Sequence, residues 1–333
     1  MTSTEAQELP TIESAQVRRF SLRINPLIGL GIGLIVLSVV LSIATDGFFT
    51  AYNLLNIFRQ ISLTSIMAVG FGITVLSGGM DISLGNVAAL TGMTVAWLVA
   101  TVGVSLGLSL LLALSLGTFV GLINGVIIAY LGVPPFITTL AMMFIAQGIT
   151  FETTRGYPIY EGMTREFLFI GQGYIGPIPF PVVIMAALFV VAHLFLSNTK
   201  LGQYIYAIGG NEEAARYTGV NVKIVKTATY GIAGFCAALT GVVMTSRLGS
   251  GQPAAAGMNF FLTAATAAIL GGIDLKGGIG NMLGVFVGAL FLGVLSNGLT
   301  LLKVSAYMQW IVMGIILVAA IVWNSARANR GIE

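Results

Sequence analysis

Residues 26–45 read PLIGLGIGLIVLSVVLSIAT, a run of twenty residues without a charged side chain. A helix needs about 20 predominantly apolar residues to cross the hydrocarbon core of a bilayer, so this run predicts a membrane-spanning helix. Nine more apolar stretches follow it and occupy most of the chain. The ten predicted spans are residues 26–45, 60–77, 86–101, 104–130, 135–154, 180–198, 227–247, 258–273, 280–301 and 306–324.

The composition agrees with a protein that is solvated by lipid. Hydrophobic residues make up 56% of the 333 residues, charged residues make up 8%, and mean hydropathy is +0.96. A water-soluble domain of this composition would expose far more apolar surface than folding could bury. A membrane β-barrel would show alternating segments of about 10 residues, and this sequence does not alternate in that way. We therefore expect an all-α integral membrane protein with about ten transmembrane helices.

Basic residues predict the orientation, because short cytosolic loops are enriched in Lys and Arg. With both termini in the cytosol, ten of the 15 basic residues lie inside and five lie outside. The inside set is Arg18, Arg19, Arg23, Lys200, Arg216, Lys223, Lys226, Lys276, Arg327 and Arg330, and the outside set is Arg59, Arg155, Arg165, Arg247 and Lys303. The reverse orientation would invert this ratio, so we expect cytosolic N- and C-termini.

The connections between spans indicate the domain organisation. We expect residues 1–25 to form a cytosolic N-terminal tail, residues 26–324 the transmembrane domain, and residues 325–333 a cytosolic C-terminal tail. Aromatic residues over 45–60 favour an interfacial helix on the outer surface. Residues 155–181 are rich in Gly, Pro and aromatic side chains and predict an ordered outer lid.

Residues 77–85 read SGGMDISLG between the second and third predicted spans. Backbone this rich in glycine is tolerated at membrane depth only where protein buries it or water reaches it. Asp81 precedes the third span, so we favour a role as the N-cap of that helix. Substrate contact is the other interpretation, because acidic residues inside membranes are often functional. The residues of this structural motif are Gly78, Gly79, Asp81, Ser83 and Gly85.

A second segment, residues 270–280, reads LGGIDLKGGIG and is similar to the first. Both contain Gly-Gly, an apolar residue, Asp and another apolar residue. A duplicated half of the protein would explain the likeness, and a chance match between short glycine-rich segments is the alternative. The residues of this motif are Gly271, Gly272, Asp274, Gly277 and Gly278.

Glycines recur at four-residue spacing in two predicted spans, which places them on one face of each helix. Because glycine lets a second backbone approach closely, we expect each stripe to pack against another helix. The stripes are Gly117, Gly121 and Gly125 in the fourth span, and Gly280, Gly284 and Gly288 in the ninth.

Three polar residues are candidates for the lining of a transport pathway. Asn124 lies beside the first glycine stripe, and Thr139 and Gln147 share one face of the fifth span. Interhelical hydrogen bonds, worth about 0.6–2 kcal/mol each, are the alternative role for such residues.

The sequence lacks the groups that catalysis or metal binding would require. It contains one cysteine, Cys236, and one histidine, which excludes a metal cluster of these residues, and Cys236 fits a small core residue. No G-x-x-x-x-G-K-[ST] loop is present, so the chain does not bind ATP through a Walker loop. The net charge of +3 gives no basic patch for nucleic acid. We expect no catalytic residue, metal site, cofactor or nucleic-acid partner.

Four segments together resemble the permease subunits of ribose-type carbohydrate-uptake ABC transporters. Residues 78–85, GGMDISLG, are similar to the family's G-G-I-D-L-S-V-G. Residues 199–219 follow its cytosolic pattern T-x-L-G-x-x-x-Y-A-x-G-G-N-x-x-A-A-x-x-x-G. Residues 250–253 match S-x-Q-P, and residues 270–280 match L-G-G-x-x-L-x-G-G-x-G. The matches occur in the family's order and with similar spacing.

The resemblance implies a permease in the bacterial inner membrane that works with a cytosolic ATP-binding subunit. It also implies a periplasmic or extracellular sugar-binding protein and a second permease copy. Residues 199–226 would form a coupling loop, whose short helix inserts into the ATPase. A short charged helix that ends at glycine suits a polar docking element, and an ordinary solvated loop is the alternative. The expected coupling residues are Asn211, Glu212, Glu213, Ala214, Ala215, Arg216 and Gly219.

An ion-coupled secondary transporter or channel is the main alternative function. It would need buried ionisable groups, and Asp81 and Asp274 are the two candidates. A membrane enzyme is the second alternative, which the absence of an acid–base or metal constellation disfavours. The small number of charges within the spans suits a neutral polar substrate, such as a pentose or hexose.

Overall fold

The computed structural model describes residues 26–330, with side chains placed for residues 27–322. The expected N-terminal tail, residues 1–25, lies outside the described residues, as do residues 331–333. Helix α13 (Ala306–Arg330) continues past the predicted span, so residues 325–330 of the expected C-terminal tail are helical.

Eight helices in the described part of the chain are long and apolar enough to cross a membrane. They are α1 (Pro26–Ala44), α2 (Ala51–Leu76), α3 (Leu84–Ala96) with its π-helical continuation η1 (Trp97–Val102), α4 (Leu106–Leu131), α5 (Pro135–Thr154), α7 (Phe180–Asn198), α10 (Val222–Leu248) and α12 (Met282–Leu301). Two shorter apolar helices are α11 (Met258–Leu270) and the Ala306–Val322 part of α13. Each of the ten predicted spans coincides with a helix, and the all-α, multi-pass class is confirmed.

Helix α2 begins well before its predicted span, so the expected interfacial helix over residues 45–60 is wrong. Thr50 caps α2, and its side chain accepts a hydrogen bond from the Asn53 backbone N–H at 3.3 Å. The Asn53 side chain is buried and exchanges hydrogen bonds with Asn297 of α12 at 2.9 and 2.8 Å. Asn53, near the start of α2, therefore bonds inside the bundle.

Residues 199–226, the expected coupling loop, are largely helical. Helices α8 (Lys200–Gly210) and α9 (Glu212–Tyr217) occupy it, and α10 starts at Val222. The Thr199 side chain caps α8 by accepting a hydrogen bond from the Gly202 N–H at 3.1 Å. Ile205 and Ile208 are buried, so packing stabilises a helix that its three glycines disfavour.

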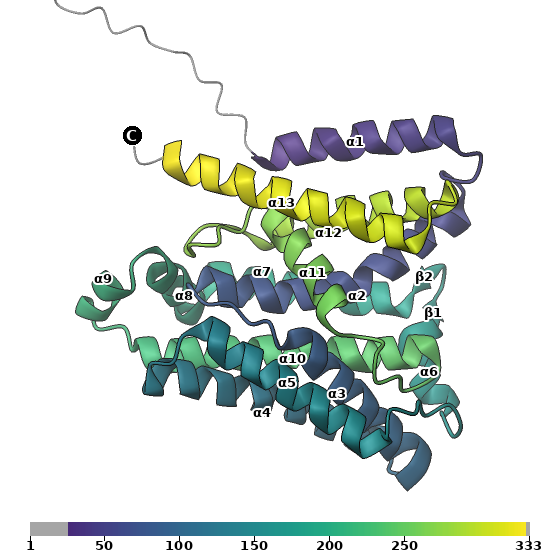
Figure 1. The fold of residues 1–333 in the computed structure, drawn as a ribbon, viewed down its shortest axis with the longest axis horizontal. Coiled ribbons are helices and arrows are strands. Elements are labelled where there is room, and N and C mark those ends of the chain that lie inside the picture. The colour runs from purple at the N-terminus through teal and green to yellow at the C-terminus, as the bar shows by residue number, and fades with distance from the viewer. Residues whose placement is uncertain (1–25, 331–333) are drawn as a thin grey trace, which may run out of the picture.

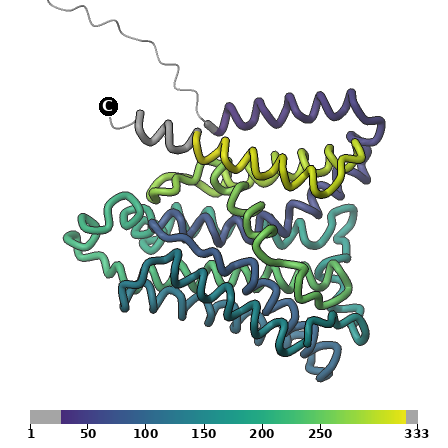
Figure 2. Tube along the Cα trace, in the orientation of Figure 1, coloured from purple at the N-terminus to yellow at the C-terminus, as the bar shows by residue number. Residues whose placement is uncertain are grey.

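The helices are stacked in layers (Figure 1). Helices α3, α4, α5 and α10 lie along one side, α2, α7 and α11 lie in the middle, and α12, α13 and α1 lie on the other side. Helices α8 and α9 project at one end of the bundle, and α6 (Arg165–Gln172) lies at the opposite end. The chain trace in Figure 2 shows α1 at the outer edge of the stack, where it packs against α12.

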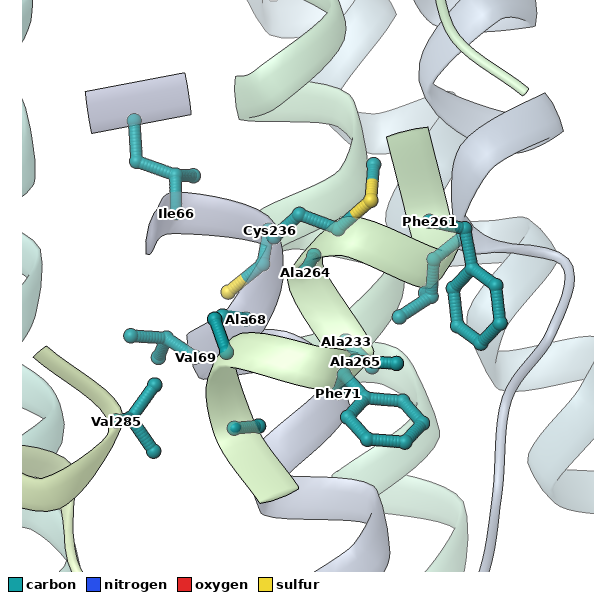
Figure 3. Packing of buried hydrophobic residues seen from close by; sticks show 14 of the residues in the cluster. Ile66, Ala68, Val69, Phe71, Ala233, Cys236, Phe261, Ala264, Ala265 and Val285 are labelled. Atoms are coloured by element: carbon teal, nitrogen blue, oxygen red, sulfur yellow. The ribbon is translucent and has the colours of Figure 1, made fainter. Parts of the chain in front are cut away.

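The core is centred on α2, which packs against α10, α11 and α12 (Figure 3). Phe71 of α2 meets Phe261 of α11 edge to face, with ring centroids 5.5 Å apart. Cys236 of α10 is buried against α2, which confirms its expected role as a small core residue. A Cβ on Gly70 would lie only 2.8 Å from Cys236 Cβ, so the two helices pack more closely than larger residues allow.

Five of the six stripe glycines lie at contacts too close for a side chain, as predicted. A Cβ on Gly121 of α4 would overlap the Tyr230 carbonyl oxygen of α10. A Cβ on Gly284 of α12 would overlap the Gly271 carbonyl oxygen at the end of α11. Gly280 lies before α12 with φ of +141°, so its assignment to a helical stripe is wrong. The remaining members are Gly117, Gly125 and Gly288.

Residues 155–181 form ordered structure at the end opposite α9. They contain α6 and an antiparallel hairpin of β1 (Tyr174–Ile175) and β2 (Ile178–Pro179). The Ser246 hydroxyl of α10 accepts a hydrogen bond from the Gly171 N–H at 2.7 Å and donates to the Phe167 carbonyl at 2.5 Å. These bonds fix the segment to the end of α10.

Candidate coupling and transport site

A buried polar cluster lies where the chain passes from α2 to α3. Asp81 is fully buried, and its Oδ1 accepts hydrogen bonds from the Ser83 backbone N–H at 2.9 Å and the Ser83 hydroxyl at 2.5 Å. Asn124 of α4 reaches the same cluster, with its Nδ2 3.1 Å from Ser83 Oγ and 3.5 Å from Asp81 Oδ2. Among the described residues no cation pairs with Asp81. Neutral donors alone therefore satisfy this carboxyl group.

The sequence suggested that Asp81 is the N-cap of α3, and the structure shows that this prediction is wrong. The N-cap is Ser83, whose side chain makes no capping hydrogen bond because its hydroxyl turns back to the Asp81 carboxylate. Asp81 lies two residues earlier and closes a turn onto Ser83. The sequence shows that Asp81 and Ser83 both lie near the start of the helix. The backbone conformation in the folded protein decides which of the two is the N-cap.

The three candidates for pathway lining lie in two environments. Asn124 and Thr139 are fully buried. The Thr139 hydroxyl donates to the Pro135 carbonyl of its own helix at 2.9 Å and lies 3.5 Å from the Met80 carbonyl oxygen. Gln147 is exposed on α5. The structure thus brings Asn124 and Thr139 to the Asp81 loop and separates Gln147 from them, and the pathway role stays a prediction.

Tyr230 is a member of this site that the sequence reasoning missed. It is fully buried in α10, and its hydroxyl donates to the Met80 carbonyl at 3.3 Å. A Cβ on Gly79 would lie 2.5 Å from the Tyr230 hydroxyl oxygen, so a larger residue at Gly79 would displace the tyrosine. The available signal was one tyrosine within the apolar sequence of α10, since a buried Tyr hydroxyl needs a partner.

Three glycine-rich segments that are far apart in the sequence meet beside α9. The Gly278 N–H donates a hydrogen bond to the Leu76 carbonyl at 3.0 Å, which joins the loop after α11 to the end of α2. Gly209 of α8 packs between them, and a Cβ there would overlap the Leu76 carbonyl oxygen and the Gly278 nitrogen. A Cβ on Gly277 would lie 2.9 Å from the Gly78 nitrogen. We call this contact the glycine junction, and it comprises residues 76–78, 209–210 and 277–278.

The two glycine-rich motifs therefore touch, although their aspartates have different environments. Asp81 is fully buried, whereas Asp274 is partly exposed and accepts a hydrogen bond from the Lys276 backbone N–H at 2.9 Å. Gly272 has φ of +94°, a conformation that favours glycine. Gly85, at the start of α3, leaves room for the Gly257 carbonyl before α11. Backbone geometry thus explains the glycines of both motifs.

Helix α9 projects from the glycine junction as a short polar element. Asn211 starts it, and its side chain accepts a hydrogen bond from the Ala214 N–H at 2.9 Å. Ala215 is the buried residue of α9, and Glu213 and Arg216 are exposed. Gly219 follows with φ of +85°, which lets the chain turn toward α10. The expected docking segment is therefore an exposed helix held at both ends.

Glu212 ties α9 to the start of α10. Its carboxylate pairs with Lys226 at 2.5 Å and with Arg216 at 3.1 Å. The hydrogen bond from Lys226 is the main reason that the pKa of Glu212 lies below its ordinary value. Tyr217 is 82% exposed at the end of α9 and is a docking candidate that the sequence reasoning omitted. Exposed tyrosines are frequent anchors in protein interfaces.

These helices define a multi-pass helical membrane protein with a short polar helix, α9, exposed at one end. The chain belongs to the permease component family of branched-chain amino acid transport systems, whose family model matches residues 53–321. Family membership establishes a transporter subunit and not an enzyme. No solved structure matches the chain.

Several characterised relatives resemble this chain over most of its length. The ribose import permease protein of Escherichia coli K12 is 42% identical over 299 residues, which cover 89% of this chain and 92% of the relative. The ribose import permease protein of Bacillus subtilis 168 is 39% identical over 298 residues, covering 89% and 92%. The D-allose transport system permease protein of E. coli K12 is 36% identical over 288 residues, covering 86% and 87%.

Proposed function

We propose that this chain is the permease subunit of an ABC importer for a monosaccharide and forms the translocation path. The observation that carries this proposal is the similarity, along 89% of the chain, to permeases named for ribose import. Permeases named for D-allose, xylose and L-arabinose are also similar to it. Among the relatives named here, none is a channel or an ion-coupled carrier, and a separate cytosolic ATPase supplies the energy.

The interior supports a neutral substrate. Among the residues whose side chains are described, Asp81 is the one charged residue that is buried, and Ser83 and Asn124 satisfy it. A path for ions or charged solutes would need exposed ionisable groups along its length. A sugar instead requires neutral hydrogen-bonding groups and apolar surface.

The partners are assigned to opposite ends of the bundle. The ATP-binding subunit docks on α9, within the coupling loop of residues 199–226. A sugar-binding protein docks at the other end, where residues 155–181 form a lid. A second permease copy completes the pathway, for which Gln147 on the exposed face of α5 is a lining candidate. Ten spans with cytosolic termini, in the inner membrane, fit this arrangement.

The proposal is tested by uptake of radiolabelled D-ribose, D-allose, D-xylose and L-arabinose into vesicles. The vesicles contain the permease with its ATPase and the binding protein encoded beside it. We expect uptake of one of these sugars that requires ATP. Uptake that is independent of ATP would favour the secondary transporter, and transport of branched-chain amino acids alone would contradict the sugar assignment.

The docking role of α9 is tested in the same vesicles with Glu213→Arg combined with Arg216→Glu, and separately with Tyr217→Ala. Loss of a buried charged contact at an interface costs about 2–5 kcal/mol, so uptake should fall by more than about tenfold while ATP hydrolysis persists. Tyr217→Phe is the matched control, because it keeps the exposed ring and loses a 3.4 Å contact to Glu213. Normal uptake by both variants would remove α9 as the coupling element.

A further inference from the structure

Five helices line an open cavity of about 600 Å³. Its walls come from the middle of α2 and α12, the early turns of α11 and α13, the last turns of α10, and the segment between α10 and α11. Sites for small ligands generally measure about 300–1,000 Å³, so the cavity is large enough for a monosaccharide. The carbonyl of Arg247, a lining residue, accepts a hydrogen bond from the Gln172 side chain at 3.2 Å, so the cavity lies beside the lid segment, on the side where the substrate would arrive.

Polar side chains with unused hydrogen-bonding capacity line this cavity. Neither the Gln60 amide nor the Thr64 hydroxyl has a hydrogen-bond partner among the described residues. The Gln252 amide nitrogen donates to Ser250 at 3.0 Å, which leaves its carbonyl oxygen available. An unpaired amide is costly at membrane depth, so these groups require water or a polar ligand. A lipid chain in the cavity would leave them unpaired.

The remaining lining suits the apolar face of a sugar ring. Phe260 and Trp310 contribute aromatic rings from α11 and α13. Arg247 adds N–H donors, and it forms no ion pair with any described carboxylate. Apolar walls with a few convergent polar groups are the usual design of a small-molecule site. Gln309 is already bonded to Ser296, Thr300 and Val304, so its role is to hold the wall in place.

We propose that this cavity is a monosaccharide-binding site within a single permease chain, which receives the sugar before it passes through the membrane. Gln60, Thr64 and Gln252 bind the hydroxyl groups, and Phe260 and Trp310 pack against the ring. The inference rests on the proposed function, because it takes its ligand class from there. It assigns selectivity to the permease itself, in addition to any selectivity of the binding protein.

The test uses the full-length permease in lipid nanodiscs, without the binding protein or the ATPase. Saturation-transfer NMR measures the binding of D-ribose, with D-ribose 5-phosphate and L-leucine as comparison ligands. Gln60→Leu and Gln252→Leu should each weaken D-ribose binding by about tenfold, since each removes hydrogen bonds to the ligand. Gln203→Leu is the matched control, because the same change on the exposed surface of α8 lies outside the cavity and should leave binding unchanged.

Each outcome decides the proposal for variants that remain monodisperse. Binding of D-ribose that both cavity variants weaken and the control retains supports it. Absence of D-ribose binding, wild-type binding by both cavity variants, or loss of binding in Gln203→Leu alone would overturn it. Tighter binding of D-ribose 5-phosphate would assign the cavity to an anion near Arg247, and preference for L-leucine would remove the sugar assignment. ATP-dependent sugar uptake is measured separately, so the importer function can stand if the cavity fails.

Discussion

Asp81 places a carboxyl group inside a membrane protein, where an unpaired charge would be strongly destabilising. The structure explains how it is tolerated: Oδ1 accepts two hydrogen bonds from Ser83, and Asn124 approaches Oδ2. The group therefore acts as an acceptor that shapes the loop between α2 and α3. This arrangement does not require a proton to move.

An amide at Asp81 should replace the carboxylate with little effect. Asp81→Asn keeps an acceptor oxygen for both Ser83 bonds, so uptake and thermal stability should stay close to wild type. Asp81→Leu leaves the buried Ser83 N–H and hydroxyl without this partner and should cost about 1–3 kcal/mol for each group. Thermal unfolding in detergent, together with sugar uptake, checks both variants. Loss of uptake in a stable Asp81→Asn protein would instead indicate proton coupling.

At the scale of single elements, α8 connects α9 to the bundle through the close packing of Gly209 against Leu76 and Gly278. The next residue, Gly210, provides a matched control because a Cβ there would meet nothing within 4 Å. The two positions have the same residue type and nearly the same place in the helix. They differ in whether another backbone occupies the space of the side chain.

Gly209→Ala should disrupt the glycine junction, whereas Gly210→Ala should be neutral or slightly stabilising. Overpacking of a tight contact costs about 1–3 kcal/mol, while alanine in a helix gains up to about 1 kcal/mol over glycine. We expect lower thermal stability and a weaker dependence of uptake on ATP hydrolysis in Gly209→Ala alone. Equal thermal stability and equal ATP-dependent uptake in the two variants would show that the glycine junction does not couple α9 to the bundle.

The contacts of α4 with α10, and of α12 with the end of α11, provide a second test at this scale. Gly121→Leu and Gly284→Leu should destabilise the bundle by more than about 3 kcal/mol, since the added side chains would overlap backbone carbonyls. Gly107→Leu is the control on α4, where a Cβ would meet nothing within 4 Å. Monodispersity and thermal unfolding in detergent measure the effect. Unchanged stability in both test variants would contradict the packing observed here.

At the scale of the whole molecule, α9 and the segment of residues 155–181 lie at opposite ends of the bundle (Figure 1). Cysteine labelling tests which end faces the cytosol. Cysteines introduced at Glu161 and Gln203, both exposed, should react with an impermeant maleimide from opposite sides. Gln203 should react in inside-out vesicles and Glu161 in spheroplasts. Labelling of both positions from one side would contradict the topology.

The sequence alone determined the class and the helices of this protein. Helices α5 and α7 have the bounds that their apolar runs predicted, 135–154 and 180–198. Hydrophobic length is a local property, and it is sufficient where lipid is the solvent. The glycine stripes were also predictable, because a four-residue spacing places them on one helix face whatever the partner is.

Only the tertiary structure decided how the motifs are used. Asn53, near the start of α2, bonds to Asn297 in α12, a partner 244 positions away. The glycine junction likewise depends on three segments that no local pattern relates to one another. Hydrogen bonds and close backbone contacts are made with whichever residue the fold brings near. The sequence therefore specified that these residues were polar or small, while packing of the whole chain specified what each one meets.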